Sequence, residues 1–169
     1  AEASSLAGTQ ELGNLIVLYD DNRITIEGQT GIAFTEDVEA RYRAYGWDVQ
    51  HVDFTRGGTD YVEDVDSLLT ALNASKKSSR PTLIRLHTVI AWPAPTKKGT
   101  GKSHGSALGD EEIAALKELL GFDPKKTFEV DKDVLAHARK VKARGKAAHK
   151  EWNKAYAVWR RKNKDGAAL

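Results

Sequence analysis

The sequence predicts an α/β fold in which a parallel sheet is flanked by helices. Segments with helical spacing alternate with short strand-like segments, in the order helix, strand, helix, strand, helix, strand, helix. The strand candidates are rich in continuous apolar residues, which is typical of strands covered on both faces. A chain of 169 residues is long enough to build the core that such a sheet requires.

The first half of the chain supplies two helix–strand pairs. We expect a helix, a strand, a helix and a strand at residues 2–11, 14–19, 35–45 and 47–54. The first of these strands reads NLIVLY, a short apolar run. Thr35 is expected to cap the second helix, and Gly46 to end it. A turn at 55–60 follows.

The second half repeats this alternation. Helical spacing predicts a helix over 61–75, and the β-branched run TLIRLHTVI predicts a strand over 82–90. Asp110 is expected to cap a helix that reaches Leu120. Two polar loops, 20–29 and 91–109, follow the first and third strands. Parallel sheets bind ligands at the carboxyl ends of their strands, so both loops are candidates for a binding site.

The charge of the chain is uneven. Residues 131–169 hold 12 Lys and Arg against 4 Asp and Glu, a net charge of +8, whereas the rest of the chain carries −6. Apolar residues from Val134 to Trp159 recur at alternating spacings of four and three, which predicts one amphipathic helix with a solvated basic face. Gly145 lies within this apolar seam and either permits close packing or breaks the helix in two.

Composition and motifs exclude several classes of protein. The chain has no Cys, which excludes disulfides and thiolate metal sites and fits a reducing compartment. No apolar run approaches the length of a membrane span, so we expect no membrane partner. No aromatic platform or nucleic-acid motif accompanies the basic segment, so we expect no nucleic-acid partner.

Three motifs in register give the chain a family resemblance. They are YDDNRITIEG at 19–28, EARYRAYGW at 39–47 and GTGKSHGSALG at 99–109. In this order and at these separations they resemble the transketolase family. The resemblance implies a thiamine-diphosphate-binding fold, with residues 1–130 as the latter part of the diphosphate-binding domain. It makes 131–169 the basic helical segment that leads from this domain to a linker.

The same resemblance implies a function. Transketolases move a two-carbon ketol unit between sugar phosphates in the pentose phosphate pathway, using thiamine diphosphate and Mg²⁺, for which Ca²⁺ can substitute. The parent enzyme is expected to be a cytoplasmic homodimer with active sites between its subunits. Its other segments would supply an upstream GDG motif, further histidines and a second domain with a catalytic glutamate. We therefore expect the 169-residue chain alone to be inactive.

Asn22, Ile24 and Ile26 are the expected metal and cofactor residues. Magnesium prefers oxygen ligands, and the resemblance assigns it the Asn22 amide oxygen and the Ile24 backbone carbonyl. It places the Ile26 side chain against the cofactor. From the residues alone, Asn22 would equally suit a left-handed turn, and Ile26 an ordinary apolar alternation. Arg23 and Ala91 stand where many relatives carry Gly.

His104 and Glu2 are the expected catalytic residues. The resemblance implies that His104 contacts both the cofactor and the sugar phosphate, and an imidazole can shuttle a proton there. It places Glu2 in a chain of acids at the subunit interface. Without the resemblance, His104 would be read only as a loop histidine and Glu2 only as an acid near the chain start. Of the four other histidines, His51 and His87 are expected to pack within strands. His137 and His149 are expected to lie exposed on the basic helix.

Two kinds of alternative remain open from the sequence. Dihydroxyacetone synthase and deoxyxylulose-phosphate synthase are thiamine-diphosphate enzymes that would use the same chemistry on other substrates. A non-catalytic fragment that docks to an acidic partner through its basic helix is an alternative of another class.

Overall fold

The sheet has three parallel strands in the order β1-β3-β2. In the computed structural model, which describes residues 1–58 and 61–168, Thr82 at the start of β3 lies opposite Ile16 of β1 and Asp48 of β2. The strands are β1 (Ile16–Asp21), β2 (Asp48–Asp53) and β3 (Thr82–His87). The predicted α/β fold with a parallel sheet is confirmed.

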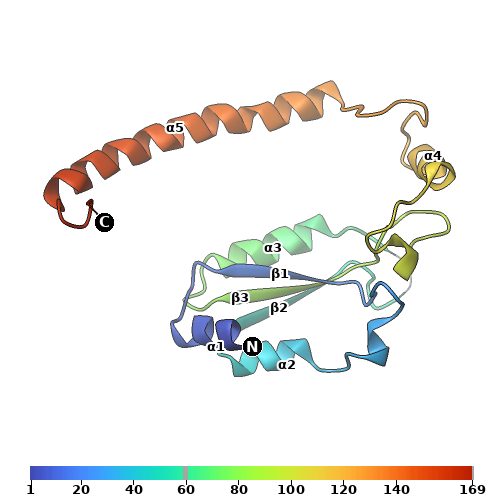
Figure 1. Ribbon diagram of the computed structural model, residues 1–169, viewed down its shortest axis with the longest axis horizontal. Helices are drawn as coiled ribbons and strands as arrows, with labels where there is room; N and C mark the ends of the chain where they lie inside the picture. The colour runs from blue at the N-terminus through green and yellow to red at the C-terminus, as the bar shows by residue number, and fades with distance from the viewer. Residues whose placement is uncertain (59–60, 169) are drawn as a thin grey trace. The chain divides into compact units, whose positions relative to one another are not determined.

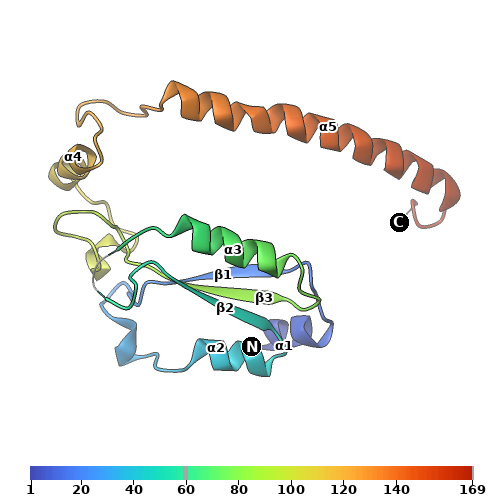
Figure 2. The same ribbon diagram turned by 180° about the vertical axis from the view of Figure 1, so that it is seen from behind.

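Helices cover both faces of this sheet. Figures 1 and 2 show α3 on one face and α1 and α2 on the other. Consecutive residues of the central strand serve the two layers, because strand side chains alternate between faces. Ile84 packs with Ala71 of α3, and Leu83 packs with Ala7 of α1. The helices in this part of the chain are α1 (Glu2–Thr9), α2 (Val38–Ala44), α3 (Val65–Ser75) and α4 (Asp110–Leu119), with single 3₁₀ turns η1 (Thr30–Ile32) and η2 (Gly101–Ser103).

Two of the predicted helix caps are wrong. The Asp37 carboxylate, not Thr35, caps α2 by accepting a hydrogen bond from the Ala40 N–H at 3.0 Å. A carboxylate at the helix start also interacts favourably with the helix dipole, which a threonine hydroxyl does less well. At α4 the N-cap is Gly109, with no side-chain cap, and Asp110 is the first helical residue.

The helix expected over 61–75 and the strand expected over 82–90 are both longer than the observed elements. The helix expected over 61–75 begins only at Val65, where the Asp64 carboxylate accepts from the Ser67 N–H. The strand expected over 82–90 ends at His87, because both neighbouring strands end opposite it and leave its continuation no partner. The last two residues of the turn expected at 55–60 lie outside the described residues.

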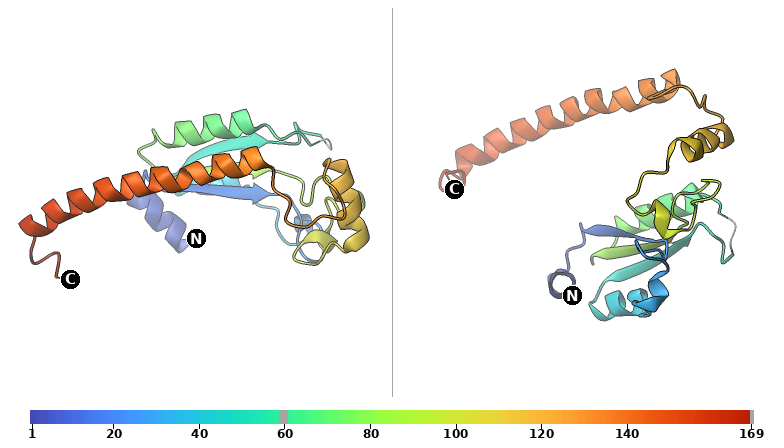
Figure 3. Two further views of the ribbon diagram at one scale, coloured as in Figure 1. Left: turned by 90° about the horizontal axis from the view of Figure 1, so that it is seen from above. Right: turned by 45° about the vertical axis from the view of Figure 1, so that its right-hand side comes forward.

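The basic segment forms one long helix, α5 (Lys132–Lys162), which Figure 3 shows running without a break. It belongs to a second compact unit, Lys125–Leu169, whereas Ala1–Pro124 form the first. The helix continues through Gly145. The expected alternative that this glycine breaks the helix in two is therefore wrong. Along one side the rings of Trp152, Tyr156 and Trp159 stack at centroid distances of 5.0 and 5.7 Å.

The side chains of α5 are exposed, which agrees with a solvated basic face and confirms that His137 and His149 lie on the surface. Among the described residues, no helix has the length and apolar character needed to cross a membrane.

Candidate functional site

A cavity of about 420 Å³ lies where the strands end. Both loops singled out in the sequence contribute to it, as the position of ligand sites in parallel sheets predicts. Among the residues around it are Asn22, Arg23 and Ile24 after β1, Thr55 after β2, and His87, Trp92 and Lys98 at the end of β3 and beyond. The cavity therefore combines hard oxygen donors with cationic side chains and one large aromatic ring.

Asn22 and Ile24 adopt a compact local arrangement. The Asn22 Oδ1 accepts a hydrogen bond from the Ile24 N–H at 3.0 Å, so the side chain folds over the turn. Arg23 between them has φ of 57°, and Ala91 in the other loop has the same φ. Glycine takes this left-handed conformation most readily, which explains physically why glycine suits both positions.

Asn22 and Ile24 could supply part of the ligand set of a hard metal ion. Amide and carbonyl oxygens are the ligands that Mg²⁺ and Ca²⁺ prefer, and Asn22 and Ile24 offer one of each beside the cavity. Within the part of the chain that the structure describes, no group of three or more His, Cys, Asp or Glu side chains could hold a metal. Asn22 and Ile24 are therefore candidate metal ligands, and among the described residues they are not joined by such a cluster.

His87 is largely buried at the end of β3, as expected of a packing residue in a strand, and it also lines the cavity. Its Nδ1 lies 3.4 Å from the Asp53 carboxylate and 3.5 Å from the Thr55 hydroxyl, because the ends of β2 and β3 are in register. Burial, followed by the positive charge of Arg23, lowers the pKa of His87. The sequence carried no signal for this position, because the strand predicted over 82–90 placed His87 in its interior.

Asp53 organises the turn after β2. Burial alone would raise its pKa, but hydrogen bonds from the Thr55 hydroxyl, the Thr55 N–H and the Gly57 N–H lower the pKa to about 2. These bonds are 2.7, 2.7 and 2.8 Å long. The ionised carboxylate is therefore the stable form, and it keeps Thr55 and His87 in place at the cavity.

His51, in contrast, is not the packing residue expected from its place in a strand. It is exposed, and its Nδ1 lies 2.9 Å from the Glu39 carboxylate. His51 and His87 project from the same face of the sheet, because His51 pairs with Arg85 and His87 lies two residues further along β3. His51 is the more exposed of the two, at 42% against 17%, since β2 is an edge strand whereas β3 lies between its neighbours.

His104 follows η2, and its N–H donates to the Gly101 carbonyl at 3.0 Å. The side chain is exposed and does not line the cavity that contains Asn22. A close backbone approach nevertheless links the two loops. A Cβ added to Gly101 would lie 2.6 Å from the Ile26 carbonyl oxygen and 2.9 Å from that of Thr25. Only glycine lets η2 rest on the turn that carries Ile24 and Ile26.

Ile26 and Glu2 differ in their surroundings. Ile26 lies in the 20–29 loop with 68% of its surface exposed, which is high for an aliphatic side chain and leaves it open to a ligand. Glu2 lies in the first turn of α1, and its side chain is fully exposed. In Figure 1, α1 lies at the end of the sheet where the strands begin, whereas the loops of the site lie at the other end. The structure thus does not bring Glu2 to the other site residues.

Glu112 of α4 anchors the long loop. Its carboxylate accepts hydrogen bonds from the Thr96 N–H, the Thr96 hydroxyl and the Lys97 N–H at 2.8, 2.8 and 3.0 Å. These bonds, led by that from the Thr96 backbone, lower the pKa of Glu112. No local pattern predicts this anchor, since the acceptor and its donors are about 15 residues apart in a region without periodicity.

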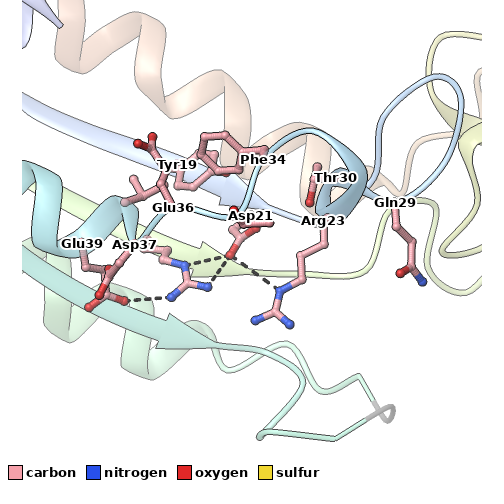
Figure 4. Close-up of a pocket in the computed structure, with 13 residues that line it drawn as sticks. Tyr19, Asp21, Arg23, Gln29, Thr30, Phe34, Glu36, Asp37 and Glu39 are labelled. Atoms are coloured by element: carbon pink, nitrogen blue, oxygen red, sulfur yellow. Dashed lines mark hydrogen bonds and ion pairs between the residues drawn. The ribbon is translucent and has the colours of Figure 1, made fainter.

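A larger cavity, of about 650 Å³, lies beside α2 (Figure 4). Charged side chains from three elements meet there: Asp21 at the end of β1, Glu39 of α2 and Arg85 of β3. The Arg85 guanidinium bonds to both carboxylates, and Arg23 lies within 4.0 Å of Asp21. Sequence reasoning had singled out none of these as a group.

Comparisons with known proteins show the family to which the chain belongs. The family model of the transketolase thiamine diphosphate binding domain matches residues 1–169. A transketolase of Mycobacterium tuberculosis is 52% identical over the whole chain, which covers 23% of that relative. A transketolase of a Nostoc species is 42% identical over 99% of the chain and 24% of the relative. The chain therefore spans about a quarter of the length of these relatives.

The fold agrees with solved structures as well. A crystal structure of a transketolase from Pichia stipitis, in complex with sedoheptulose 7-phosphate, aligns with a TM-score of 0.85 and 39% identity. The alignment covers 99% of this chain and 24% of that one. A transketolase from Leishmania mexicana aligns with a TM-score of 0.81 over 94% of the chain and 23% of the other.

Proposed function

Because the chain belongs to the transketolase family, we propose that it is part of an enzyme that transfers a two-carbon ketol unit between sugar phosphates. The observation that supports this most directly is the cavity at the strand ends, where Asn22 and Ile24 present oxygen atoms beside His87 and Lys98. A diphosphate with its magnesium ion has the complementary charge and ligand chemistry. Thiamine diphosphate would supply the electron sink for breaking a carbon–carbon bond next to a carbonyl.

In this proposal Asn22 and Ile24 hold the metal. The Asn22 Oδ1 has two acceptor sites, so it can keep the Ile24 N–H at 3.0 Å and still offer a lone pair to Mg²⁺ or Ca²⁺. The Ile24 carbonyl supplies the second oxygen. The diphosphate, water and segments outside this chain would complete the octahedron.

Ile26 and His104 face the reacting part of the site in this proposal. Ile26 is an exposed aliphatic side chain that an apolar ring of the cofactor would cover. His104 would donate a hydrogen bond to the diphosphate or to a substrate oxygen and move a proton there. The contact of Gly101 with the backbone of Thr25 and Ile26 supports this, since it ties the loop of His104 to the cofactor turn.

The partners in this proposal are sugar phosphates, the remaining segments of the enzyme and a second subunit. Glu2, exposed and remote from the cavity, would meet the partner subunit as one member of a chain of acids. The parent would be cytoplasmic, which the absence of Cys fits. Residues 1–130 would be the latter part of the diphosphate-binding domain and 131–169 its helical extension, although Leu169 lies outside the described residues.

An activity assay of the full-length parent tests the proposal. Purified parent, supplied with thiamine diphosphate and Mg²⁺, is expected to convert xylulose 5-phosphate and ribose 5-phosphate. No turnover with this pair would argue against a transketolase. Turnover by condensation of pyruvate would then indicate deoxyxylulose-phosphate synthase, and turnover with formaldehyde as acceptor would indicate dihydroxyacetone synthase. The isolated 169-residue chain is expected to show no ketol transfer.

One observation favours the alternative of a non-catalytic binding fragment. The stacked rings of Trp152 and Tyr156 are exposed on a helix rich in Lys and Arg, and such a face could dock to an acidic partner. Binding of this kind would weaken steeply as salt is added, because it depends on screened charges. A chain that bound an acidic partner and ignored thiamine diphosphate, within an inactive parent, would replace the enzymatic proposal.

A further inference from the structure

Arg85 connects two carboxylates that are far apart in sequence. Its Nε and Nη2 lie 2.8 and 2.6 Å from the Asp21 Oδ2, and its Nη1 lies 3.1 Å from the Glu39 Oε1. Asp21 is 64 residues and Glu39 is 46 residues away along the chain. Figure 4 shows Asp21 and Glu39 with the bonds that join them through this guanidinium.

The three groups are shielded from water. The side chains of Arg85, Asp21 and Glu39 retain 22%, 11% and 13% of their exposure. Glu39 also bonds Arg43 at 2.8 Å and His51 at 2.9 Å, whereas the only other cation near the Asp21 carboxylate among the described residues is Arg23, at 4.0 Å. Asp21 therefore depends on Arg85 much more than Glu39 does.

Asp21 is the last residue of β1 and directly precedes Asn22. Its backbone carbonyl accepts from the Thr88 N–H at 3.3 Å, and Arg23 beyond Asn22 takes a left-handed conformation. The Asp21 side chain is therefore held by Arg85 at the point where the chain leaves the strand, one residue before Asn22. A buried carboxylate without its cation would be costly and would turn toward water, which would move the end of β1 and Asn22 with it.

We propose that Arg85 is a positioning residue for the metal and diphosphate site, acting on Asn22 through the carboxylate of Asp21. Glu39 extends this connection to α2, because it fixes the other side of the same guanidinium. The inference rests on the proposed function, since it requires that Asn22 serve the cofactor. A purely structural role would lower cofactor affinity only as much as any other equal loss of stability does.

The test uses the full-length parent and compares Arg85→Met, Arg85→Lys and the control Arg41→Met. Arg41 is also an ion-paired arginine, but it lies on α2 and pairs with Glu36, outside the group around Asp21. The readouts are the affinity for thiamine diphosphate with Mg²⁺, from titration calorimetry, and the melting temperature of the cofactor-free protein. We expect Arg85→Met to weaken cofactor affinity by about 10- to 100-fold, as is typical when an outer-shell partner is lost.

Arg85→Lys is expected to recover part of this affinity, because an ammonium keeps the charge but cannot fork between two carboxylates. Arg41→Met is expected to bind as the wild type does. Val52→Ala, a cavity in the core on the α3 face, provides a second control, since it lowers stability without altering these charges. A purely structural role predicts equal loss of affinity in Arg85→Met and Val52→Ala at equal loss of melting temperature.

The two proposals fail in different ways. A wild-type parent that does not bind thiamine diphosphate would reject the proposed function. A wild type that binds it, together with Arg85→Met and Arg85→Lys variants that bind within twofold of it, would reject only the positioning role.

Discussion

The amide oxygen of Asn22 accepts a hydrogen bond from the backbone N–H of Ile24 at 3.0 Å, so the two expected magnesium ligands are already joined. Replacing Asn22 by Ala removes both this bond and one ligand. In the parent we expect Mg²⁺ and thiamine diphosphate affinity to fall together, by more than the roughly 10- to 100-fold of an outer-shell change. Titration calorimetry measures both, and a circular dichroism spectrum like that of the wild type would show that the fold is kept. Unchanged cofactor affinity would refute the role of Asn22.

Gly101 should tolerate no side chain. An alanine Cβ would lie 2.6 Å from the Ile26 carbonyl, so η2 would have to move off the cofactor turn. We expect Gly101→Ala to destabilise the protein by about 1–3 kcal/mol and to weaken cofactor binding, because His104 moves with η2. Gly31→Ala is the matched control, since a Cβ there meets no atom within 4 Å. Equal melting temperatures for the two variants would contradict the prediction.

Glu112 should keep the start of the long loop ordered. Glu112→Ala removes the acceptor of the Thr96 and Lys97 N–H groups, so these amides are expected to lose protection from hydrogen exchange. The pKa of Glu112 is lowered, and its contribution is therefore present above the usual carboxyl pKa and lost as the pH falls through the lowered value. Glu111→Ala, one residue away and exposed, should leave the same amides protected.

Asp53 should make stability depend on acid pH. Its pKa is about 2 in the folded chain against 3.8 for an unperturbed carboxyl, which corresponds to roughly 2 kcal/mol. Because the folded pKa is the lower one, this contribution is present above about pH 4 and lost as the pH falls toward 2. Asp53→Asn should abolish this part of the profile in urea denaturation of the chain. The exposed Glu63→Gln should keep the profile, and a wild-type profile in Asp53→Asn would contradict the assignment.

Replacing Gly145 by Ala should increase the stability of α5. It lies inside α5, and a Cβ there meets no atom within 4 Å. Gly145→Ala is expected to stabilise the helix by about 1 kcal/mol, since glycine is the poorer helix former. Thermal melting followed by circular dichroism measures this in the 169-residue chain. A loss of stability in the full-length parent alone would instead indicate that another segment packs closely on Gly145.

The elements that the sequence predicted well are those with a local signal. The apolar run at 14–19 overlaps β1, which begins at Ile16 and continues to Asp21, and the run at 82–90 contains β3. The seam from Val134 to Trp159 predicts the length of α5. Element ends were less accurate, because a cap depends on which polar side chain reaches a free N–H. Asp37 does so at α2, although Thr35 also stood near the start of the helix.

The candidate site also has one part that local sequence predicts and another part that depends on long-range contacts. Asn22, Ile24 and Ile26 lie within five residues, and their shared turn follows from their place after a strand. The position of His87 in a strand predicts a packing residue, and nothing local shows that Asp53 and Thr55 lie beside it. The contact of Gly101 with Ile26 was equally out of reach, since it joins loops 75 residues apart.

By itself the sequence determined that this chain forms helices and parallel strands in alternation, with polar loops at the ligand-binding edge, because these features follow from apolar spacing and from turn residues. Only the tertiary structure decided that β3 lies between β1 and β2. That order places Arg85 between Asp21 and Glu39, and His87 beside Asp53. Periodicity reports which residues are buried, whereas the partner that satisfies a buried charge depends on which strands become neighbours.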